Sequence, residues 1–158
     1  MSKSKFVYVS YIRTTPEKLW EALTRPEFTR QYWGNMENHS DWRAGSKWEH
    51  RNPADKEDPI WITGRVVESD RPRRLVLTWA DPANLSDESR VTFEITQIED
   101  LTELTVIHGE FHPGSDMATK VQWGWPRVLS SLKSFLETGK GFDIMRVKKA
   151  SGESPCGS

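Results

Sequence analysis

The sequence has little of what would suggest a secreted, membrane or nucleic-acid-binding protein. One of its 158 residues is cysteine, Cys156, and a single thiol cannot form an internal disulfide, so we expect a reducing, cytoplasmic compartment. No apolar run is long enough for a membrane helix, and the basic residues 1–5 lead into no signal-like apolar stretch. Because 22 basic and 23 acidic residues leave a net charge of −1, neither nucleic acid nor an anionic membrane is an expected partner.

Tryptophan, in contrast, is abundant, with eight in 158 residues. Each indole can bury a large area and carries an N–H that needs an acceptor. So many amphipathic rings suit a lined cavity, although an ordinary core could also use them. Composition alone leaves both interpretations open.

The pattern of apolar and polar residues up to about residue 112 predicts one strand, two short helices and then more strands. Residues 6–12 are β-branched and aromatic, which is typical of a strand. Thr15 and Pro16 predict the start of a short helix, and a second short helix follows Pro26. From there to about residue 112, alternating apolar residues predict antiparallel strands, with a bend at Gly64 and a loop over residues 81–89.

The second half of the pattern predicts one long helix. Apolar residues recur at helical spacing over residues 117–137, Pro126 predicts a kink or restart, and Gly139 predicts the end. We therefore expect a single α+β domain over residues 1–141, with a curved antiparallel sheet of about six to seven strands wrapped on the C-terminal helix. Residues 142–158 are rich in Lys, Ser, Gly and Pro and predict a flexible tail.

Several segments, taken in order, resemble the signature of one family. Residues 24–27 with 32–34 are similar to its "TDPE…WWG" motif, and residues 41–48 to its "D-x-R-x-G-G-x-W" turn, with Ser46 at the second glycine. Residues 64–68 and 71–79 resemble its "G-x-V-x-E…P-x-R-L-V-x-T-W" strands, and residues 104–108 and 124–126 its last strand and helix. The chain thus resembles, over about residues 6–138, the SRPBCC or START-like superfamily (birch-pollen-allergen fold).

Within that superfamily the chain looks like the branch related to the activator of a heat-shock protein's ATPase. The resemblance implies a helix-grip fold with a hydrophobic cavity between the sheet and the long helix. It also implies a chaperone as a possible partner. The eukaryotic co-chaperone carries an additional N-terminal docking domain, which we do not expect within these 158 residues.

Candidate cavity residues follow from the strand faces that point to the helix, and from the helix stripe itself. The alternative is that the same residues simply fill a core, which is the ordinary place for apolar side chains. Polar atoms on an apolar face need a partner in either case. The predicted ligand-binding residues are Trp33, Met36, Trp79, Phe93, Val106, His108, Trp125, Leu129 and Leu132.

The histidines are the candidate residues for acid–base catalysis. His108 is either a core histidine satisfied by a Trp or Tyr partner, or a polar anchor or proton donor for a ligand. His108 and His112 are four residues apart, which on a strand spans roughly 13 Å, too far for one metal ion. We therefore expect neither a metal nor another cofactor.

Three hypotheses for function remain. The first is binding of a small hydrophobic molecule, lipid-like or aromatic, in the helix–sheet cavity. The second is an enzyme on the same fold, a cyclase, dehydratase or hydrolase of a hydrophobic substrate with His108 as acid or base. The third is an interaction module like the chaperone ATPase activator. We expect a monomer, or a weak dimer joined through strand edges.

Overall fold

The computed structural model describes residues 5–146. Ten elements follow one another along this part of the chain, and their types confirm the predicted α+β class. They are β1 (Phe6–Ile12), α1 (Pro16–Thr24), α2 (Pro26–Tyr32), β2 (Glu37–Ser40), β3 (Lys47–Arg51), β4 (Ile60–Asp70), β5 (Arg74–Asp81), β6 (Asn84–Ile98), β7 (Leu101–Gly109) and α3 (Asp116–Thr138).

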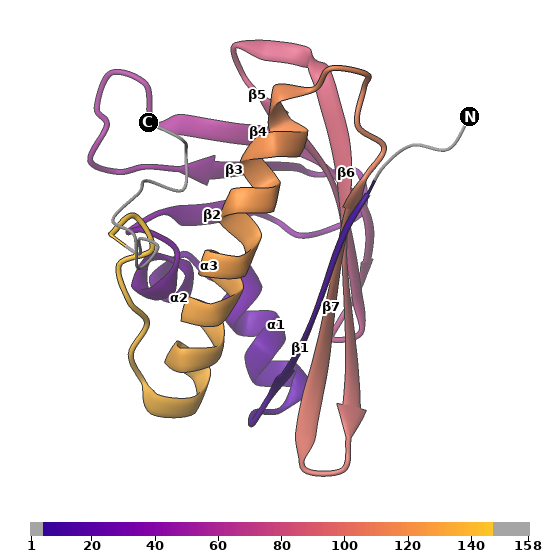
Figure 1. Ribbon diagram of the computed structural model, residues 1–158, viewed down its shortest axis with the longest axis vertical. Coiled ribbons are helices and arrows are strands. Elements are labelled where there is room, and N and C mark those ends of the chain that lie inside the picture. Colours follow the sequence, from indigo (N-terminus) through magenta and orange to yellow (C-terminus); the bar gives the residue numbers. More distant parts are fainter. Residues whose placement is uncertain (1–4, 147–158) are drawn as a thin grey trace, which may run out of the picture.

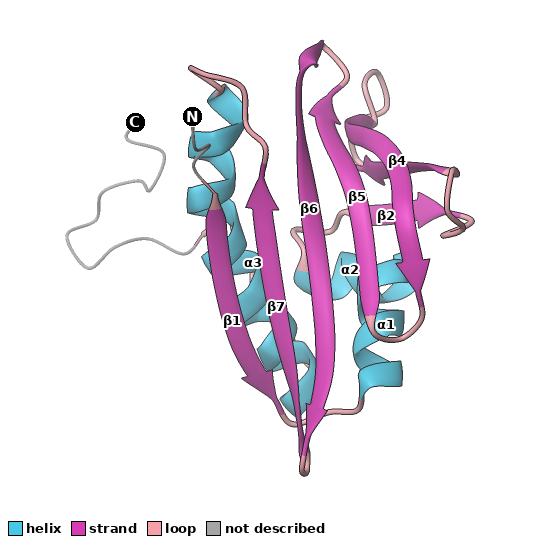
Figure 2. Ribbon diagram, turned by 90° about the vertical axis from the view of Figure 1, so that its right-hand side faces the viewer, coloured by secondary structure: helices cyan, strands magenta, loops and turns pink. Residues whose placement is uncertain are grey.

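The seven strands form one antiparallel sheet in the order β1-β7-β6-β5-β4-β3-β2. All three helices lie on the same face of this sheet, and α3, the element with the most residues, runs along it (Figure 1). The view from the side shows the other face free of helices (Figure 2). This arrangement confirms the predicted helix-grip architecture.

The helix ends follow from local chemistry. Thr15 caps α1 by accepting a hydrogen bond from the Lys18 N–H at 3.2 Å, and Pro16 occupies the first helical position. Ser115 caps α3 in the same way, and Gly139 ends it in the left-handed conformation with φ of 86°. These caps fix where each helix meets the sheet.

The predicted restart at Pro126 is wrong, because α3 is continuous from Asp116 to Thr138. Pro126 has no N–H to offer the carbonyl of Gln122. The next carbonyl, of Trp123, accepts a hydrogen bond from Arg127 Nη1 at 2.7 Å. The apolar stripe also continues on the same face after the proline, so packing on the sheet holds both halves in one helix.

Two further details of the sheet differ from the prediction. Residues 81–89 are not a loop, because Asp81 pairs with Asn84 and Trp79 with Ser89 in the hairpin of β5 and β6. The side chains at this end of the hairpin are mostly exposed, so the sequence here is polar. It therefore shows none of the alternation of apolar and polar residues that predicts a half-buried strand. The four-residue β2 was not predicted, since it is short and polar and depends on pairing with β3.

Gly64 in β4 has a specific packing reason. A Cβ at this position would lie 2.0 Å from the carbonyl oxygen of Thr78 and 2.6 Å from Trp48 Nε1. That same Trp48 N–H donates to the Thr78 carbonyl at 2.7 Å. The missing side chain thus allows the indole of a fully buried tryptophan to close on the neighbouring strand.

The chain returns along α3 after the helix ends. The Phe142 N–H donates to Ser131 Oγ at 2.9 Å, and Ile144 is 5% exposed and joins the core. Most of the predicted flexible tail, residues 142–158, and Cys156 lie outside the described residues, and the domain end at residue 141 stays a prediction. Within the described part of the chain, the helices are too short or too polar to cross a membrane.

Candidate functional site

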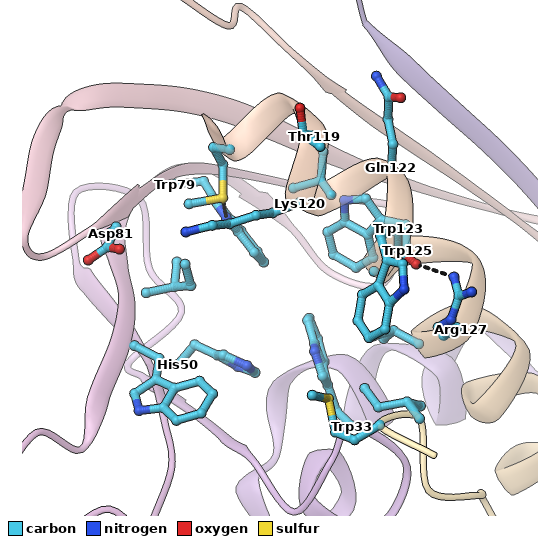
Figure 3. A pocket seen from close by; sticks show the side chains of 18 of the residues that line it. Trp33, His50, Trp79, Asp81, Thr119, Lys120, Gln122, Trp123, Trp125 and Arg127 are labelled. Carbon is cyan, nitrogen blue, oxygen red and sulfur yellow. Dashed lines mark hydrogen bonds between the residues drawn. The ribbon is translucent and has the colours of Figure 1, made fainter. Parts of the chain in front are cut away.

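A cavity of about 1010 Å³ lies between the N-terminal half of α3 and strands β3 to β5 (Figure 3). Ile60, Trp61 and Ile62 of β4 form one wall, and residues 117–128 of α3 contribute most of the opposite wall. Exposed side chains such as Trp61, which is 46% exposed, show that the cavity opens to solvent. The predicted gap between helix and sheet is therefore present at one end of the helix.

Three of the nine predicted site residues line this cavity, namely Trp33, Trp79 and Trp125. The other six are buried in the core away from it: Met36, Phe93, Val106, His108, Leu129 and Leu132. Phe93 and Val106 pair across β6 and β7, and Leu129 and Leu132 belong to the later turns of α3, where helix and core pack without a gap. The ligand-binding role of all nine stays a prediction.

The three tryptophans form one aromatic cluster. The ring centroid of Trp125 lies 5.5 Å from that of Trp33 and 5.4 Å from that of Trp79. Trp79 Nε1 donates to Met117 Sδ at 3.2 Å, and Trp125 Nε1 donates to His108 Nδ1 at 3.0 Å. Because these two N–H groups have protein partners, what Trp79 and Trp125 can offer a ligand is apolar ring surface.

His108 is fully buried, and both of its ring nitrogens have partners. Nδ1 accepts from Trp125, so the proton of the neutral ring sits on Nε2, which lies 2.8 Å from Ser89 Oγ. The Ser89 hydroxyl in turn donates to the Trp79 carbonyl at 3.4 Å. Burial lowers the pKa of His108 to about 3, so the ring is neutral near pH 7. Both nitrogens are thus engaged within the protein, as the core-histidine interpretation expects, and the role of His108 toward a ligand stays a prediction.

His50 on β3 is a buried polar residue of the cavity that the sequence analysis missed. It is 6% exposed and lines the cavity, and its ring centroid lies 4.7 Å from that of Trp33 with the two rings tilted by 47°. Its Nδ1 lies 2.6 Å from Asn38 Oδ1, and burial lowers its pKa to about 3. The alternation of side chains along a strand could have identified it, because this alternation places His50 on the same face as Trp48.

Four charged side chains border the cavity, Asp58, Asp81, Lys120 and Arg127. Arg127 is held by its own helix, since its guanidinium lies 4.6 Å from the centre of the Trp123 ring and donates to the Trp123 carbonyl (Figure 3). None of the four enters an ion pair with another described residue. In residues 5–146, no three His, Cys, Asp or Glu side chains are grouped as metal ligands would be.

A long C-terminal helix gripped by a curved antiparallel sheet, with an apolar cavity between them, defines the helix-grip class of α+β proteins. Within this class the chain belongs to the family described as activator of Hsp90 ATPase homolog 1-like protein, whose model matches residues 13–137. This match confirms the resemblance inferred from the sequence motifs. No curated protein matches the chain.

Solved structures with the same fold include proteins from three different organisms. The Aha1 dimer from Colwellia psychrerythraea is 22% identical, with a TM-score of 0.72 over 87% of this chain and 99% of that one. CalU16 from Micromonospora echinospora is 20% identical, with a TM-score of 0.69 over 87% and 78%. An HSP90 activator from Plasmodium falciparum is 21% identical, with a TM-score of 0.68 over 84% and 95%. At such identities the likeness shows the shared fold.

Proposed function

We propose that the protein binds a small hydrophobic molecule, aromatic or lipid-like, in the cavity between α3 and strands β3 to β5. The observation that supports this most is the aromatic wall of Trp33, Trp79 and Trp125 around a space of about 1010 Å³. Cavities of roughly 300–1,000 Å³ with mainly apolar walls and few polar groups are typical of small-molecule sites.

The expected affinity for a simple probe follows from the apolar area that it buries. An aromatic molecule that loses about 200 Å² of accessible surface gains about 5 kcal/mol at 25 cal/mol per Å². Micromolar dissociation requires about 8 kcal/mol, and immobilising the ligand opposes binding. We therefore expect two-ring aromatics to bind between the micromolar and millimolar ranges, and a better-matched natural ligand to bind more tightly.

Gly124 offers a way to close the cavity without weakening the helix. It lies in the wall on α3, and a Cβ there would meet no atom within 4 Å. Gly124→Leu should place an apolar side chain in this open space while also improving helix propensity. Ser130→Leu is a matched control, because Ser130 is an exposed position of the same helix.

The experiment measures thermal unfolding of the three proteins against a library of aromatic and aliphatic molecules. A ligand that binds the native state raises the melting temperature by mass action. We expect such ligands to stabilise the wild type and Ser130→Leu, and to have little effect on Gly124→Leu. A library that stabilises none of the proteins, or all three equally, would contradict the proposal.

A second candidate is chaperone activation, supported by the family description and by the Plasmodium relative named as an HSP90 activator. Its test is the steady-state ATPase rate of a purified Hsp90 with and without an excess of this protein. A raised rate that Gly124→Leu retains would assign activation to a surface separate from the cavity. An unchanged rate would exclude this candidate for the chaperone tested.

A further inference from the structure

The orientation of His50 is set by a chain of buried hydrogen bonds. Asn38, which is 4% exposed, uses its Nδ2 to donate to the Leu23 carbonyl at 3.2 Å. Its Oδ1 is therefore the atom that faces His50, and it accepts from His50 Nδ1 at 2.6 Å. Asn38 on β2, held in turn by α1, thus fixes the imidazole ring and its proton.

The same chain determines which nitrogen of His50 remains available. With the proton on Nδ1, the other nitrogen of a neutral imidazole carries an unshared electron pair and can only accept. Burial lowers the pKa of His50 to about 3, so the neutral form persists near pH 7. Nε2 is consequently a hydrogen-bond acceptor, and a ligand that covers it without donating to it leaves it unpaired, which is unfavourable.

Nε2 has no donor within the described residues, and the ring extends toward the cavity (Figure 3). The neighbouring indole N–H groups of Trp48, Trp79 and Trp125 already donate to protein atoms. Trp33, whose ring lies 4.7 Å from that of His50, makes no hydrogen bond through Nε1 to any residue the structure describes. The inner part of the cavity thus combines one open acceptor and one open donor with aromatic surface.

We propose that the cavity selects an aromatic molecule with a hydroxyl group, whose O–H donates to His50 Nε2 while its ring packs against Trp33 and Trp79. This inference rests on the proposed function and specifies its ligand class. A hydroxyl both donates and accepts, and so it matches the open pair formed by His50 and Trp33. The class includes phenols, naphthols and larger hydroxylated polycyclic aromatics.

Two other ligand classes fit this arrangement less well. An ether or ketone can only accept, which leaves His50 Nε2 buried without a donor. A carboxylate also only accepts, and pairing with His50 would require protonation of a ring whose surroundings strongly oppose it. A carboxylate ligand would instead place its charged group beside Lys120 at the cavity border, away from the inner wall.

The test is isothermal calorimetry of the wild type with four ligands that share one ring system: naphthol, methoxynaphthalene, naphthoate and naphthalene. We expect naphthol to bind about tenfold or more tightly than methoxynaphthalene, because the latter leaves the acceptor unsatisfied. In His50→Phe this preference should disappear, while naphthalene binding is kept. Ser130→Leu, the exposed change on α3 outside the cavity, should keep the preference.

Nitrogen NMR of the wild type provides a measurement that does not depend on a variant folding. The spectrum should show the proton of His50 on Nδ1, and naphthol should shift the Nε2 resonance while methoxynaphthalene does not. Binding without preference for the hydroxyl, or tighter binding of naphthoate, overturns this inference and leaves the proposed function standing. Failure of all four ligands to bind also overturns this inference, and the thermal-unfolding library then decides the proposed function separately.

Discussion

Trp125 and His108 are joined by a buried hydrogen bond of 3.0 Å that ties α3 to β7. His108 continues the connection to Ser89 on β6. Replacing His108 by alanine leaves the N–H of Trp125 and the Ser89 hydroxyl without this partner and also opens a void. We expect His108→Ala to lower the free energy of unfolding by about 3 kcal/mol or more. Urea denaturation measures this.

The control for that change is His112→Ala, since His112 is exposed. It should alter stability by less than about 0.5 kcal/mol. A His108→Ala protein as stable as the wild type would contradict the structural role. If a substrate is found, loss of turnover by a still-folded His108 variant would support the hypothesis of an acid or base at this position.

Gly64 should not tolerate even a methyl group. The added Cβ would lie 2.0 Å from the Thr78 carbonyl oxygen, which belongs to the backbone and cannot rotate away. We expect Gly64→Ala to destabilise the protein by about 4 kcal/mol, measured as the shift in the denaturation midpoint. Near wild-type stability would show that β4 and β5 can separate without cost.

Replacing Gly124 by alanine should stabilise the protein, in contrast to the same replacement at Gly64. Space is open around its Cβ direction, and glycine inside a helix costs about 1 kcal/mol relative to alanine. We expect Gly124→Ala to raise the free energy of unfolding by about 0.5–1 kcal/mol. A destabilised Gly124→Ala protein would mean that the helix wall at this point is already closely packed.

Lowering the pH from 7 to 5 should lower the free energy of unfolding, in a range where carboxylates stay ionised. The pKa of His50 and that of His108 are lowered from 6.5 to about 3 by burial. Below about pH 6.5 the unfolded chain binds protons that the native state does not, so stability falls with decreasing pH. Each histidine should cost about 2 kcal/mol between pH 7 and pH 5, and nothing above this range.

The measurement is the free energy of unfolding in urea at several pH values from 7 to 5. His50→Phe removes one of the two groups, so its stability should fall about half as steeply as that of the wild type. A wild-type curve that is flat over this range would show that the two histidines titrate in the native state as they do in the unfolded chain.

Most of the fold could be predicted because its patterns are periodic and local. Leu75, Leu77 and Trp79 alternate along β5, and Val121, Trp125 and Leu129 recur at helical spacing. Where the pattern was polar, the prediction failed, as in β2 and in the hairpin at residues 81–89. Such segments form strands because a neighbouring strand pairs with them, and their own sequence does not show it.

The position of the cavity along α3 could not be predicted from the sequence. The stripe of α3 is apolar over its whole length, and the distance between helix and sheet depends on how many side chains pack together. The gap opens beside Trp125, whereas Leu129 and Leu132 close on the core. His50 lies among charged residues in Lys47–Arg51 and faces a cavity wall only because β3 pairs with β4.

The four charged groups at the cavity border bear on how quickly a ligand could enter. Asp58 and Asp81 are offset by Lys120 and Arg127, and the whole chain carries a net charge of −1. Opposed charges this close together produce little long-range field, and long-range attraction is what makes association rates depend on ionic strength. A neutral molecule would therefore reach the cavity at a rate that salt hardly changes, and an anion would have no kinetic advantage over it.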